Sequence, residues 1–516
     1  MEWDLENVDR YTDTVVKSHA PDLKIPPEMC IAEAPVEPCT IVVFGATGDL
    51  TRRKLAPSLY HLYLNGGLPE SFAILGAARS EMSREQFQER IKQSAAGMDM
   101  SGWAQFADSL YYEQLQFDSP ESFAKLSRTL ESLEEKHKTR GNKIFYLALP
   151  PSFYGSTAEM LGDAGLAQEE QGGNRWSRIV VEKPFGRDLE SAKRLNATLH
   201  KHFEERQIFR IDHYLAKETV QNVLILRFAN AIFEPIWNRM FIDRVEVTAT
   251  ETLGVENRAA YYEQAGVLRD MFQNHMLQLL AVIAMEPPSR FDADRVRDET
   301  SKVFRSLRPF SQVDPTKHLV LGQYDAGTID GRNVPGYPEE PKVAPDSLTP
   351  TFAMMKVLVD NWRWQGVPFY LTSGKRLAKK LTHIVIHFKR VPHSMFREFL
   401  GEVISPNMLT LGIYPEERIH LTFQTKNPGA QVCLRSVRMD FDYQENYSGP
   451  SLDAYEKVLI ECMQGDQTLF WRQDAVELCW CFLDPILEDC ETCADRGRRL
   501  RRYEAGSWGP QAGFMG

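Results

Sequence analysis

Positively charged residues are in the minority in this chain of 516 residues. Its 60 lysines and arginines stand against 71 aspartates and glutamates, which gives a formal net charge of −11. Sequence-independent nucleic-acid binding needs many cations that neutralise phosphates, so this balance argues against a nucleic-acid partner. A small anionic substrate stays compatible with the sequence if a local basic pocket lies within the acidic protein.

Long apolar runs are also lacking. No run of about 18 apolar residues occurs, so we expect no membrane span. The acidic start, Met1–Asp4, lacks the basic flank and apolar core of a secretory signal. Only eight cysteines occur, two near the start and six after residue 430, and they form no disulfide framework. We therefore expect reduced thiols and a cytoplasmic protein.

Four of the late cysteines invite a zinc interpretation. Cys479, Cys481, Cys490 and Cys493 form a C-x-C…C-x-x-C pattern. The alternative is small buried side chains, because two cysteines that are two residues apart in a helix-like stretch face different directions. No paired histidine completes a familiar spacing, and we predict no metal site.

The composition suits a large globular protein. With 43% hydrophobic and 25% charged residues, the bulk of the chain can bury a core, and the length predicts two to four domains at roughly 150 residues each. Residues 1–37 are polar and rich in proline, and we predict a tail or strap. We predict a Rossmann-like α/β coenzyme domain over residues 38–212 and a larger α+β domain over residues 213–516.

The first domain begins with a β-turn-α-β pattern. A β-branched apolar run at Thr40–Phe44 precedes a glycine-containing turn, helical spacing over Leu50–Leu64 and a second run at Phe72–Leu75. This order is the unit of a parallel sheet. Further strands are predicted at Lys143–Leu149 and Arg178–Val181.

The second domain has a different pattern. Amphipathic stretches predict helices over Tyr214–Phe228 and Gly266–Met285, and residues 327–350 read as a long surface loop. Strands that follow strands predict a mainly antiparallel sheet with helices on one face. These strands are predicted at Val245–Thr250, Ala353–Val359, Ile384–Phe388, Leu409–Ile413 and His420–Phe423.

The turn after the first strand reads Gly45-Ala46-Thr47-Gly48-Asp49-Leu50. Glycines there let the backbone approach a pyrophosphate, and the following helix N-terminus supplies free N–H donors. The spacing is G-x-x-G and not the usual G-x-G-x-x-G, so a tight turn without a ligand is the alternative. The surrounding βαβ unit favours a dinucleotide.

Arg79 follows the second strand, where NAD-binding sites usually carry an acid for the ribose hydroxyls. No acid occurs there before Glu81. A cation lies where the 2′-phosphate of NADP would bind, so we predict NADP as coenzyme and NAD as a weaker substitute. A solvated surface arginine is the alternative.

Lys183 lies in Glu182-Lys183-Pro184-Phe185-Gly186, directly after a predicted strand. Ligands of open parallel sheets bind beyond the carboxyl ends of the strands, so Lys183 is predicted to reach the coenzyme crevice. The alternative is an ordinary loop lysine.

The segment Arg210–Glu218 is the most specific in the chain. Asp212 suits the N-cap of the following helix, and His213, Tyr214 and Lys217 are spaced to share one face of its first turns. A cation, an imidazole and a phenol at a helix N-terminus suit a phosphate group. A simple cap with packed helix residues is the alternative, and the spacing alone does not decide between them.

His275 lies in an apolar helix, where a lone histidine is usually a packed core residue. Asp270 precedes it by one turn, and Glu251 lies at a predicted strand end upstream. Two acids and a histidine suit the oxidation of a sugar hydroxyl, since a base removes the proton while hydride leaves the same carbon and carboxylates hold the other hydroxyls.

Together these segments resemble the glucose-6-phosphate dehydrogenase family. The motifs G-A-[ST]-G-D-L, E-K-P-F-G, R-I-D-H-Y-L-x-K-E and R-D-x-x-Q-N-H occur in the family's order, and the resemblance covers about residues 40–510. It implies a Rossmann-like domain, a larger α+β domain built on a mainly antiparallel sheet, and association through that sheet as a homodimer or homotetramer. The implied reaction oxidises C1 of glucose 6-phosphate to 6-phosphoglucono-1,5-lactone with NADP, the first step of the oxidative pentose phosphate pathway.

The resemblance also implies a role for individual residues. His275 is the general base, and Asp212 orients and stabilises its imidazole. The implied substrate contacts are Lys183, His213, Tyr214, Lys217, Glu251, Asp270, Lys375 and, more approximately, Lys380. The implied coenzyme contacts are Gly45, Ala46, Thr47, Gly48, Asp49, Leu50, Arg52, Arg79, Tyr154 and Lys183.

The chain departs from the family pattern at several positions. Gly412 and Tyr414 replace the Arg and Gln of the usual R-x-Q-P pattern, which puts one substrate contact in question, and Ala216 replaces a Gly. Leu381 and Val385 stand where some members use basic residues for a second, structural NADP, so we predict no such site.

Two other functions would account for part of this set of residues. A dehydrogenase of a non-phosphorylated sugar would have no use for the cations at His213 and Lys217. A non-enzymatic dinucleotide sensor would keep the Gly45–Gly48 turn but would need neither His275 nor Asp212. The presence of both sets of residues favours the phosphate-binding enzyme.

Overall fold

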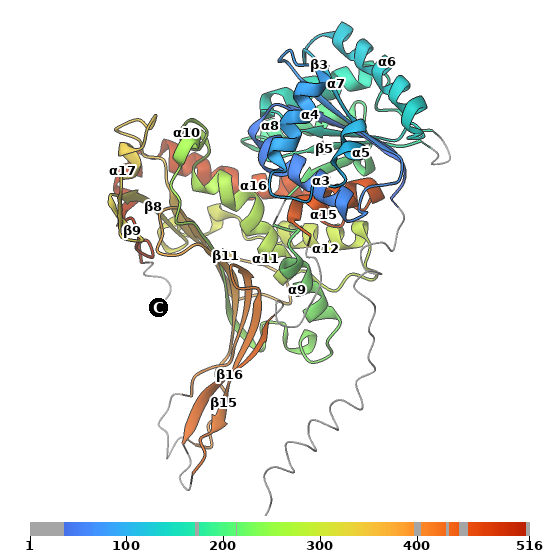
Figure 1. Ribbon diagram of the computed structural model, residues 1–516. Helices are drawn as coiled ribbons and strands as arrows, with labels where there is room; N and C mark the ends of the chain where they lie inside the picture. The colour runs from blue at the N-terminus through green and yellow to red at the C-terminus, as the bar shows by residue number, and fades with distance from the viewer. Residues whose placement is uncertain are drawn as a thin grey trace, which may run out of the picture.

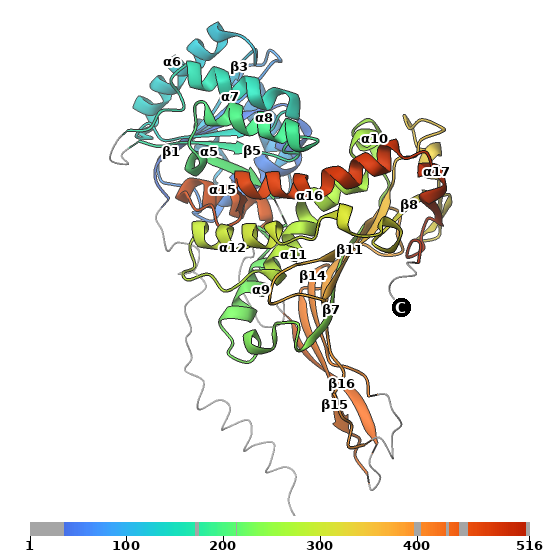
Figure 2. The same ribbon diagram turned by 180° about the vertical axis from the view of Figure 1, so that it is seen from behind.

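The computed structural model of the chain describes residues 36–170, 175–212, 214–396, 404–429, 433–442 and 452–511. Two sheets form its frame (Figure 1). The first sheet and its helices make a rounded unit, and the second sheet is long and extends away from it as a curved blade. Seen from behind, helices α12, α15 and α16 lie between the two sheets (Figure 2).

The first sheet has seven strands in the order β17-β6-β5-β4-β1-β2-β3. The six strands β1 to β6 pair in parallel, whereas β17 pairs antiparallel with β6. The strands are β1 (Cys39–Phe44), β2 (Phe72–Ala78), β3 (Leu110–Gln114), β4 (Lys143–Leu147), β5 (Ser177–Val181), β6 (Ile208–Ile211) and β17 (Phe470–Trp471). The four runs predicted here are confirmed as strands, whereas β3, β6 and β17 were not predicted.

Helices cover both faces of this sheet. In α6 (Pro120–His137) the apolar residues Phe123, Leu126, Leu130 and Leu133 recur at helical spacing and are buried, which fixes its face toward the strands. The other helical segments here are η1 (Thr51–Leu55), α3 (Ala56–Leu64), α4 (Arg84–Ser94), α5 (Trp103–Asp108), η2 (Pro151–Phe153), α7 (Tyr154–Asp163), α8 (Leu189–His200) and η3 (Glu205–Gln207).

The second sheet has nine strands in the order β16-β15-β14-β13-β7-β12-β11-β8-β18. It is mainly antiparallel, as predicted, and its parallel pairs are β7 with β12 and β8 with β18. The strands are β7 (Ile242–Thr250), β8 (Leu319–Asp325), β11 (Phe352–Leu358), β12 (Pro368–Gly374), β13 (Leu381–Phe388), β14 (Met408–Tyr414), β15 (Arg418–Lys426), β16 (Leu434–Asp442) and β18 (Leu500–Glu504).

The helices of this part include α11 (Leu277–Ala284), in which every residue is buried, so this helix forms the centre of the core. It continues directly from the π-helix η6 (Leu268–Met276). The others are α9 (Glu218–Phe228), η4 (Glu234–Ile236), η5 (Glu256–Arg258), α10 (Ala259–Val267), α12 (Ala293–Arg305), η7 (Phe310–Gln312), η8 (Pro315–Lys317), α15 (Ala454–Gln464), α16 (Gln473–Thr492) and α17 (Arg496–Arg499).

Two predictions about this part were wrong. The helix expected from Tyr214 begins only at Glu218, because the Asp212 carboxylate accepts the Tyr214 N–H at 2.9 Å and the intervening residues form turns. The segment 327–350 is not a plain loop, since it contains the hairpin strands β9 (Gly327–Ile329) and β10 (Arg332–Val334) and the short helix η9 (Tyr337–Glu339).

The described residues contain neither a membrane-spanning helix nor a metal-binding cluster. Within these ranges no helix is long and apolar enough to cross a membrane. Within the same ranges no group of three or more His, Cys, Asp or Glu side chains is arranged to hold a metal ion. The predicted tail at residues 1–37 lies outside the described residues up to residue 35.

Candidate active site

The predicted catalytic residues lie where strand ends of both sheets face the π-helix η6. Asp212 directly follows β6, and Lys183 follows β5. In the second sheet, Glu251 and Lys375 follow the parallel pair β7 and β12, and the Glu251 N–H donates to the Gly374 carbonyl at 2.9 Å. A parallel pair inside a mostly antiparallel sheet therefore brings an acid and a cation to the same edge.

His275 is held from both ring nitrogens. Its Nδ1 lies 2.5 Å from the Asp212 carboxylate, and its Nε2 lies 2.7 Å from the Lys183 ammonium. Because an ammonium can only donate, Nε2 accepts and the ring proton lies on Nδ1 toward Asp212. This is the tautomer that a base acting through Nε2 requires.

Further contacts hold this pair in place. The Trp471 indole N–H donates to the second Asp212 oxygen at 3.4 Å. The Tyr214 ring stacks on the imidazole with centroids 4.0 Å apart. The side chains of His275 and Asp212 are each only 1% exposed, so the catalytic pair is fixed before any ligand binds.

The π-helical geometry of η6 explains why Asp270 and His275 act on the same group. Residues five apart on an α-helix point about 140° away from each other. A π-helix, with its i→i+5 hydrogen bonds, brings such residues to one face. Lys183 Nζ accordingly contacts His275 Nε2 at 2.7 Å and also lies 3.9 Å from the Asp270 carboxylate. His275 is therefore not an isolated histidine of an apolar core, because both of its ring nitrogens have polar partners.

The electrostatics favour a neutral imidazole. Burial lowers the pKa of His275, and the nearby Lys183 ammonium lowers it further, although the Asp212 carboxylate opposes both. A histidine whose pKa lies below its usual value is uncharged at neutral pH and can accept a proton.

Asp270 and Glu251 form a second group of polar side chains with Lys375. The Lys375 ammonium pairs with the Glu251 carboxylate and lies 3.9 Å from Asp270. Burial favours the protonated acid, but Lys183, Lys375 and Arg258 outweigh it and lower the pKa of Asp270. The carboxylate stays charged and can accept hydrogen bonds from hydroxyl groups.

Lys217, Lys380 and Tyr414 form a cationic face beside Tyr214. The Lys217 ammonium lies 4.3 Å from the centre of the Tyr214 ring and 5.7 Å from that of Tyr414. The Lys380 ammonium lies 4.5 Å from the Tyr414 ring centre. Burial and the neighbouring Lys380 lower the pKa of Lys217. Two cations beside one aromatic ring suit a doubly charged anion. Lys217 itself is the N-cap of α9 and does not lie inside that helix, where the sequence predicts it.

The glycine turn of the first sheet is tightly built. Gly45 has φ +80°, and a Cβ there would lie 2.1 Å from the Ala148 carbonyl oxygen, so only glycine fits. Its N–H donates to Ala77 O at 2.8 Å, and the Thr51 hydroxyl donates to Gly45 O at 3.1 Å. The turn is thereby fixed against the ends of β2 and β4 and leaves its outer side open to a phosphate group.

A hollow of about 360 Å³ lies next to this turn, lined by Arg52, Arg53, Arg90, Gln93 and Ser94. Arg90 donates to the Thr47 carbonyl at 2.6 Å, and Arg52 and Arg53 both bond Asp49, which lowers the pKa of that acid. Arg79 is exposed at the end of β2, 5.8 Å over the Phe153 ring. The donors therefore fit a dinucleotide with a phosphorylated ribose.

Comparison with known proteins gives the same picture over nearly the whole chain. The family model described as the NAD binding domain of glucose-6-phosphate dehydrogenase matches residues 42–222, and that of its C-terminal domain matches residues 224–514. The chain belongs to the glucose-6-phosphate dehydrogenase family. Its first domain accordingly binds a nicotinamide dinucleotide.

Individual relatives support the assignment. Glucose-6-phosphate 1-dehydrogenase of Aggregatibacter actinomycetemcomitans is 48% identical over 92% of this chain and 95% of its own. The Bacillus subtilis protein of the same name is 42% identical over 91% of this chain and 95% of its own. A solved glucose-6-phosphate dehydrogenase in complex with its substrate glucose-6-phosphate superposes with a TM-score of 0.85, at 34% identity over 93% of this chain and 96% of that one.

One departure from the family pattern has a structural reason. Gly412 lies in β14, where a Cβ would lie 2.2 Å from the Glu416 carbonyl oxygen, so the family's arginine does not fit this backbone. Tyr414 replaces the family's glutamine and contacts both lysines of the cationic face. The cationic face is therefore arranged differently from the usual R-x-Q-P pattern.

Several residues near the site were missed by the sequence analysis. Trp471 bonds Asp212 from 259 residues away, a separation at which no motif connects them. Tyr261 donates to Asp270 at 3.4 Å, and Arg258 lies 3.8 Å from the same acid. Arg90, on α4, could have been found from its basic character near the turn. His213 lies outside the described residues, and Tyr154 is only 1% exposed at the start of α7. The roles of both stay predictions.

Proposed function

We propose that the protein oxidises C1 of glucose 6-phosphate to 6-phosphoglucono-1,5-lactone and passes the hydride to NADP. The observation that carries this proposal is the buried Asp212–His275 pair, whose Nε2 accepts from the Lys183 ammonium between a carboxylate group and a cationic face. A family of this name acts on a sugar phosphate, and the arrangement supplies a base, hydroxyl acceptors and phosphate-binding cations.

His275 acts as the general base. Its Nε2 takes the proton of the C1 hydroxyl, and Asp212 stabilises the imidazolium that forms. The coenzyme supplies the hydride acceptor when bound. Without substrate, the Lys183 ammonium contacts Nε2 of His275. The substrate hydroxyl takes the place of this contact, and the ammonium then holds the sugar oxygen.

The remaining residues fix the sugar. Asp270 and Glu251 accept hydrogen bonds from its hydroxyls, with Lys375 beside them. Lys217 and Lys380 bind the phosphate together with Tyr214 and His213. Binding that holds the C1–H bond in one orientation speeds the reaction, because the reacting atoms are already correctly placed.

The preference for NADP rests on guanidinium groups near the glycine turn. Arg79 lies exposed at the end of β2, and Arg52 lines the neighbouring hollow. A planar guanidinium binds a 2′-phosphate through two parallel hydrogen bonds. Gly45 to Leu50 bind the pyrophosphate through the turn and the following helix N-terminus, and Tyr154 and Lys183 complete the coenzyme contacts.

We also assign an oligomeric state. The outward positions Leu381, Val385 and Met408 of the second sheet are only partly buried, and Phe241 and Met439 are exposed. Apolar side chains on a sheet face suit a second copy of the chain, so residues 213–516 associate as a homodimer or homotetramer. A cytoplasmic location is part of this proposal, supported by the free thiols of the described cysteines.

A spectrophotometric assay tests the proposed reaction. Reduced nicotinamide should form with glucose 6-phosphate and NADP, more slowly with NAD and hardly with glucose. Equal rates with glucose and glucose 6-phosphate would contradict the phosphate assignment, and equal KM values for NAD and NADP would contradict the coenzyme preference. Analytical ultracentrifugation tests the oligomeric state, and a monomer at micromolar concentration would contradict it.

A further inference from the structure

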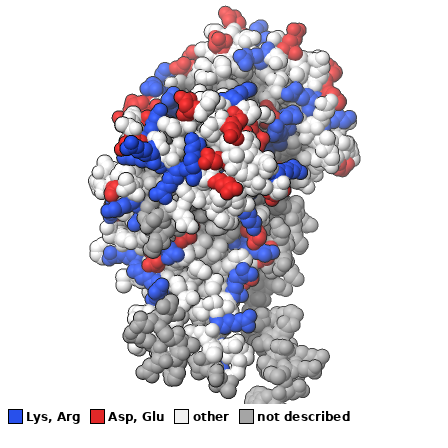
Figure 3. All heavy atoms as spheres, turned by 90° about the vertical axis from the view of Figure 1, so that its left-hand side faces the viewer, with Lys and Arg blue, Asp and Glu red and all other residues white. Residues whose placement is uncertain are grey.

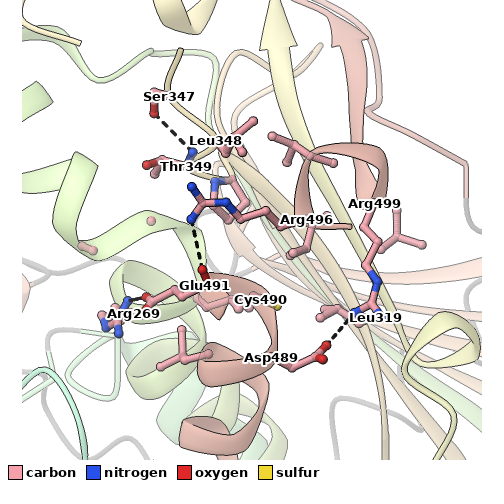
Figure 4. A pocket seen from close by; sticks show the side chains of 18 of the residues that line it. Arg269, Leu319, Ser347, Leu348, Thr349, Asp489, Cys490, Glu491, Arg496 and Arg499 are labelled. Carbon is pink, nitrogen blue, oxygen red and sulfur yellow. Dashed lines mark hydrogen bonds and ion pairs between the residues drawn. The ribbon is translucent and has the colours of Figure 1, made fainter. Parts of the chain in front are cut away.

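A cavity of about 700 Å³ lies apart from the residues of the active site. It opens between the junction of α10 and η6, the segment 346–350, the end of α16 and the start of β18 (Figure 4). None of Lys183, Asp212, Asp270 or His275 lines it. Its volume falls within the range of ordinary small-molecule sites.

Arginines from four segments of the chain converge on this cavity: Arg187, Arg269, Arg496, Arg498, Arg499 and Arg501. Four acids, Glu263, Asp346, Asp489 and Glu491, also line it, so the cations are in excess within a protein of net charge −11. The side of the molecule where α17 lies in Figure 1 shows Lys and Arg side chains gathered beside a few acids (Figure 3).

The pairing of these arginines leaves positive charge free. Arg269 pairs with Glu491 and Arg499 with Asp489. Arg496 points across the cavity in Figure 4. Among the described residues its side chain donates only to the Glu491 carbonyl at 3.0 Å, and a carbonyl oxygen neutralises no charge. Arg498 is exposed and bonds no side chain among the described residues.

Leucines form another part of the wall. Leu268, Leu319, Leu321, Leu348, Leu487 and Leu500 line the cavity together with Pro350. A site that binds only small anions would need no cavity lined with leucine side chains. The combination fits a ligand with a flat apolar ring and an anionic chain, because the ring removes leucine surface from water and guanidinium groups bind phosphates through paired hydrogen bonds.

We propose that this cavity binds a nucleoside phosphate as a second ligand, separate from substrate and coenzyme. The base lies against the leucines, and the phosphates contact Arg496 and Arg498. Binding reaches the active site through Arg269, which directly precedes Asp270 on η6 and also donates to the Arg187 carbonyl at 2.9 Å. A phosphate that competes with the Glu491 carboxylate for Arg269 weakens this ion pair and shifts the helix that carries His275, so the ligand changes the affinity for glucose 6-phosphate.

Calorimetry of the full chain tests the binding. The protein is first saturated with NADPH and glucose 6-phosphate, a pair that cannot react together, so that neither known site is free. ATP is then titrated in, with inorganic triphosphate and adenosine as separate arms. We expect saturable binding of ATP, and affinity at least about tenfold lower in the double variant Arg496→Ala/Arg498→Ala. No saturable binding, or equal affinity in the variant, would overturn the proposal.

Two controls sharpen the result. Arg502→Ala removes a neighbouring exposed arginine that bonds Gln323 and does not line the cavity, so it should bind ATP as the parent does. An equal loss in this variant would overturn the site. Inorganic triphosphate should bind more weakly than ATP, and equal affinities would overturn the assignment to a nucleoside phosphate.

A kinetic readout tests the coupling. At saturating NADP, ATP should shift the KM for glucose 6-phosphate by about fivefold or more, and the double variant should lose this shift. Because both substituted arginines are exposed, the melting temperature without ATP should stay unchanged. An unchanged KM while ATP binds would overturn the link through Arg269.

Discussion

The proposed catalytic pair and the side chains that follow the glycine turn differ in how far they are buried. The side chains of His275 and Asp212 are 1% exposed and held by an indole and a stacked phenol, whereas those of Asp49 and Arg52 are 63% and 53% exposed. The groups proposed to move the proton are held in a dry core, whereas side chains proposed to bind the coenzyme lie at the surface beside a turn whose backbone is fixed. Changes in the core should lower kcat, and changes at the surface should raise KM.

The largest effect is expected at His275. His275→Asn keeps a polar side chain but removes the base, so kcat should fall by ~10² or more with little change in KM for glucose 6-phosphate. Initial rates followed at the reduced-nicotinamide band give both parameters. His318→Asn, at a half-buried position away from the site, is the control and should behave as the parent does. Parental turnover in His275→Asn would refute the base assignment.

Asp212→Asn should lower kcat by roughly tenfold to a hundredfold, the range for a hydrogen bond to a charged group. It removes the carboxylate that raises the pKa of His275, so this pKa should fall further. Because the neutral imidazole is the active form, the acid limb of kcat/KM should move to lower pH, which a pH–rate profile measures.

Lys183→Gln is the matched opposite, because it removes a cation that lowers the pKa of His275 and should move the same limb to higher pH. Shifts in the same direction for both variants would show that His275 does not set the limb.

The cationic face should respond in KM. Lys217→Ala removes an ammonium from the proposed phosphate site, so KM for glucose 6-phosphate should rise tenfold or more while the poor rate with glucose hardly changes. His213→Ala should do the same. Steady-state kinetics with both sugars measure the difference, and Lys302→Ala, on the exposed side of α12, is the control. Equal losses for both sugars would mean that this face does not bind the phosphate.

Arg79 tests the surface half of the comparison. Arg79→Ala should raise KM for NADP by roughly tenfold and leave KM for NAD nearly unchanged, because only NADP carries the 2′-phosphate. Rates with each coenzyme at saturating sugar phosphate give the two values. Arg128→Ala, on the exposed side of α6, should alter neither. If both coenzymes weaken by one factor, Arg79 does not recognise the 2′-phosphate.

Tyr414 should give the smallest effect. Tyr414→Gln restores the family's residue but removes the ring shared by Lys217 and Lys380. Each cation–π contact contributes about 0.5–1 kcal/mol, so KM for glucose 6-phosphate should rise about two- to fivefold while kcat stays unchanged. A lower KM in this variant would show that the ring hinders the phosphate.

The fold was predictable where the pattern is local. Alternating and β-branched runs located β1, β2, β4 and β5, and the glycine turn identified the coenzyme unit. The helix expected from Tyr214 failed because Asp212 looks like an N-cap in sequence but caps a turn in the structure. An aspartate can cap either a helix or a turn, and the direction of the chain after β6 determines which of the two forms.

The site was predictable as a set of residues but not as an arrangement. Motifs named His275, Asp212 and Lys183, yet the contact between Lys183 and Nε2 depends on η6 being a π-helix, which has no recognised sequence signature here. Trp471 escaped because its contact with Asp212 is a long-range one. The periodicity of apolar residues predicts contacts between residues near each other in sequence. It does not predict contacts between residues far apart in the chain.

Strand β17 sets the order in which the molecule can be completed. During synthesis, Asp212 leaves the ribosome 259 residues before Trp471. Until Phe470 and Trp471 arrive, β6 is an open edge of the first sheet and can pair with another nascent chain. Each newly made chain therefore passes through a stage in which the edge of β6 can pair with another chain. A chain truncated before residue 470 retains that open edge permanently.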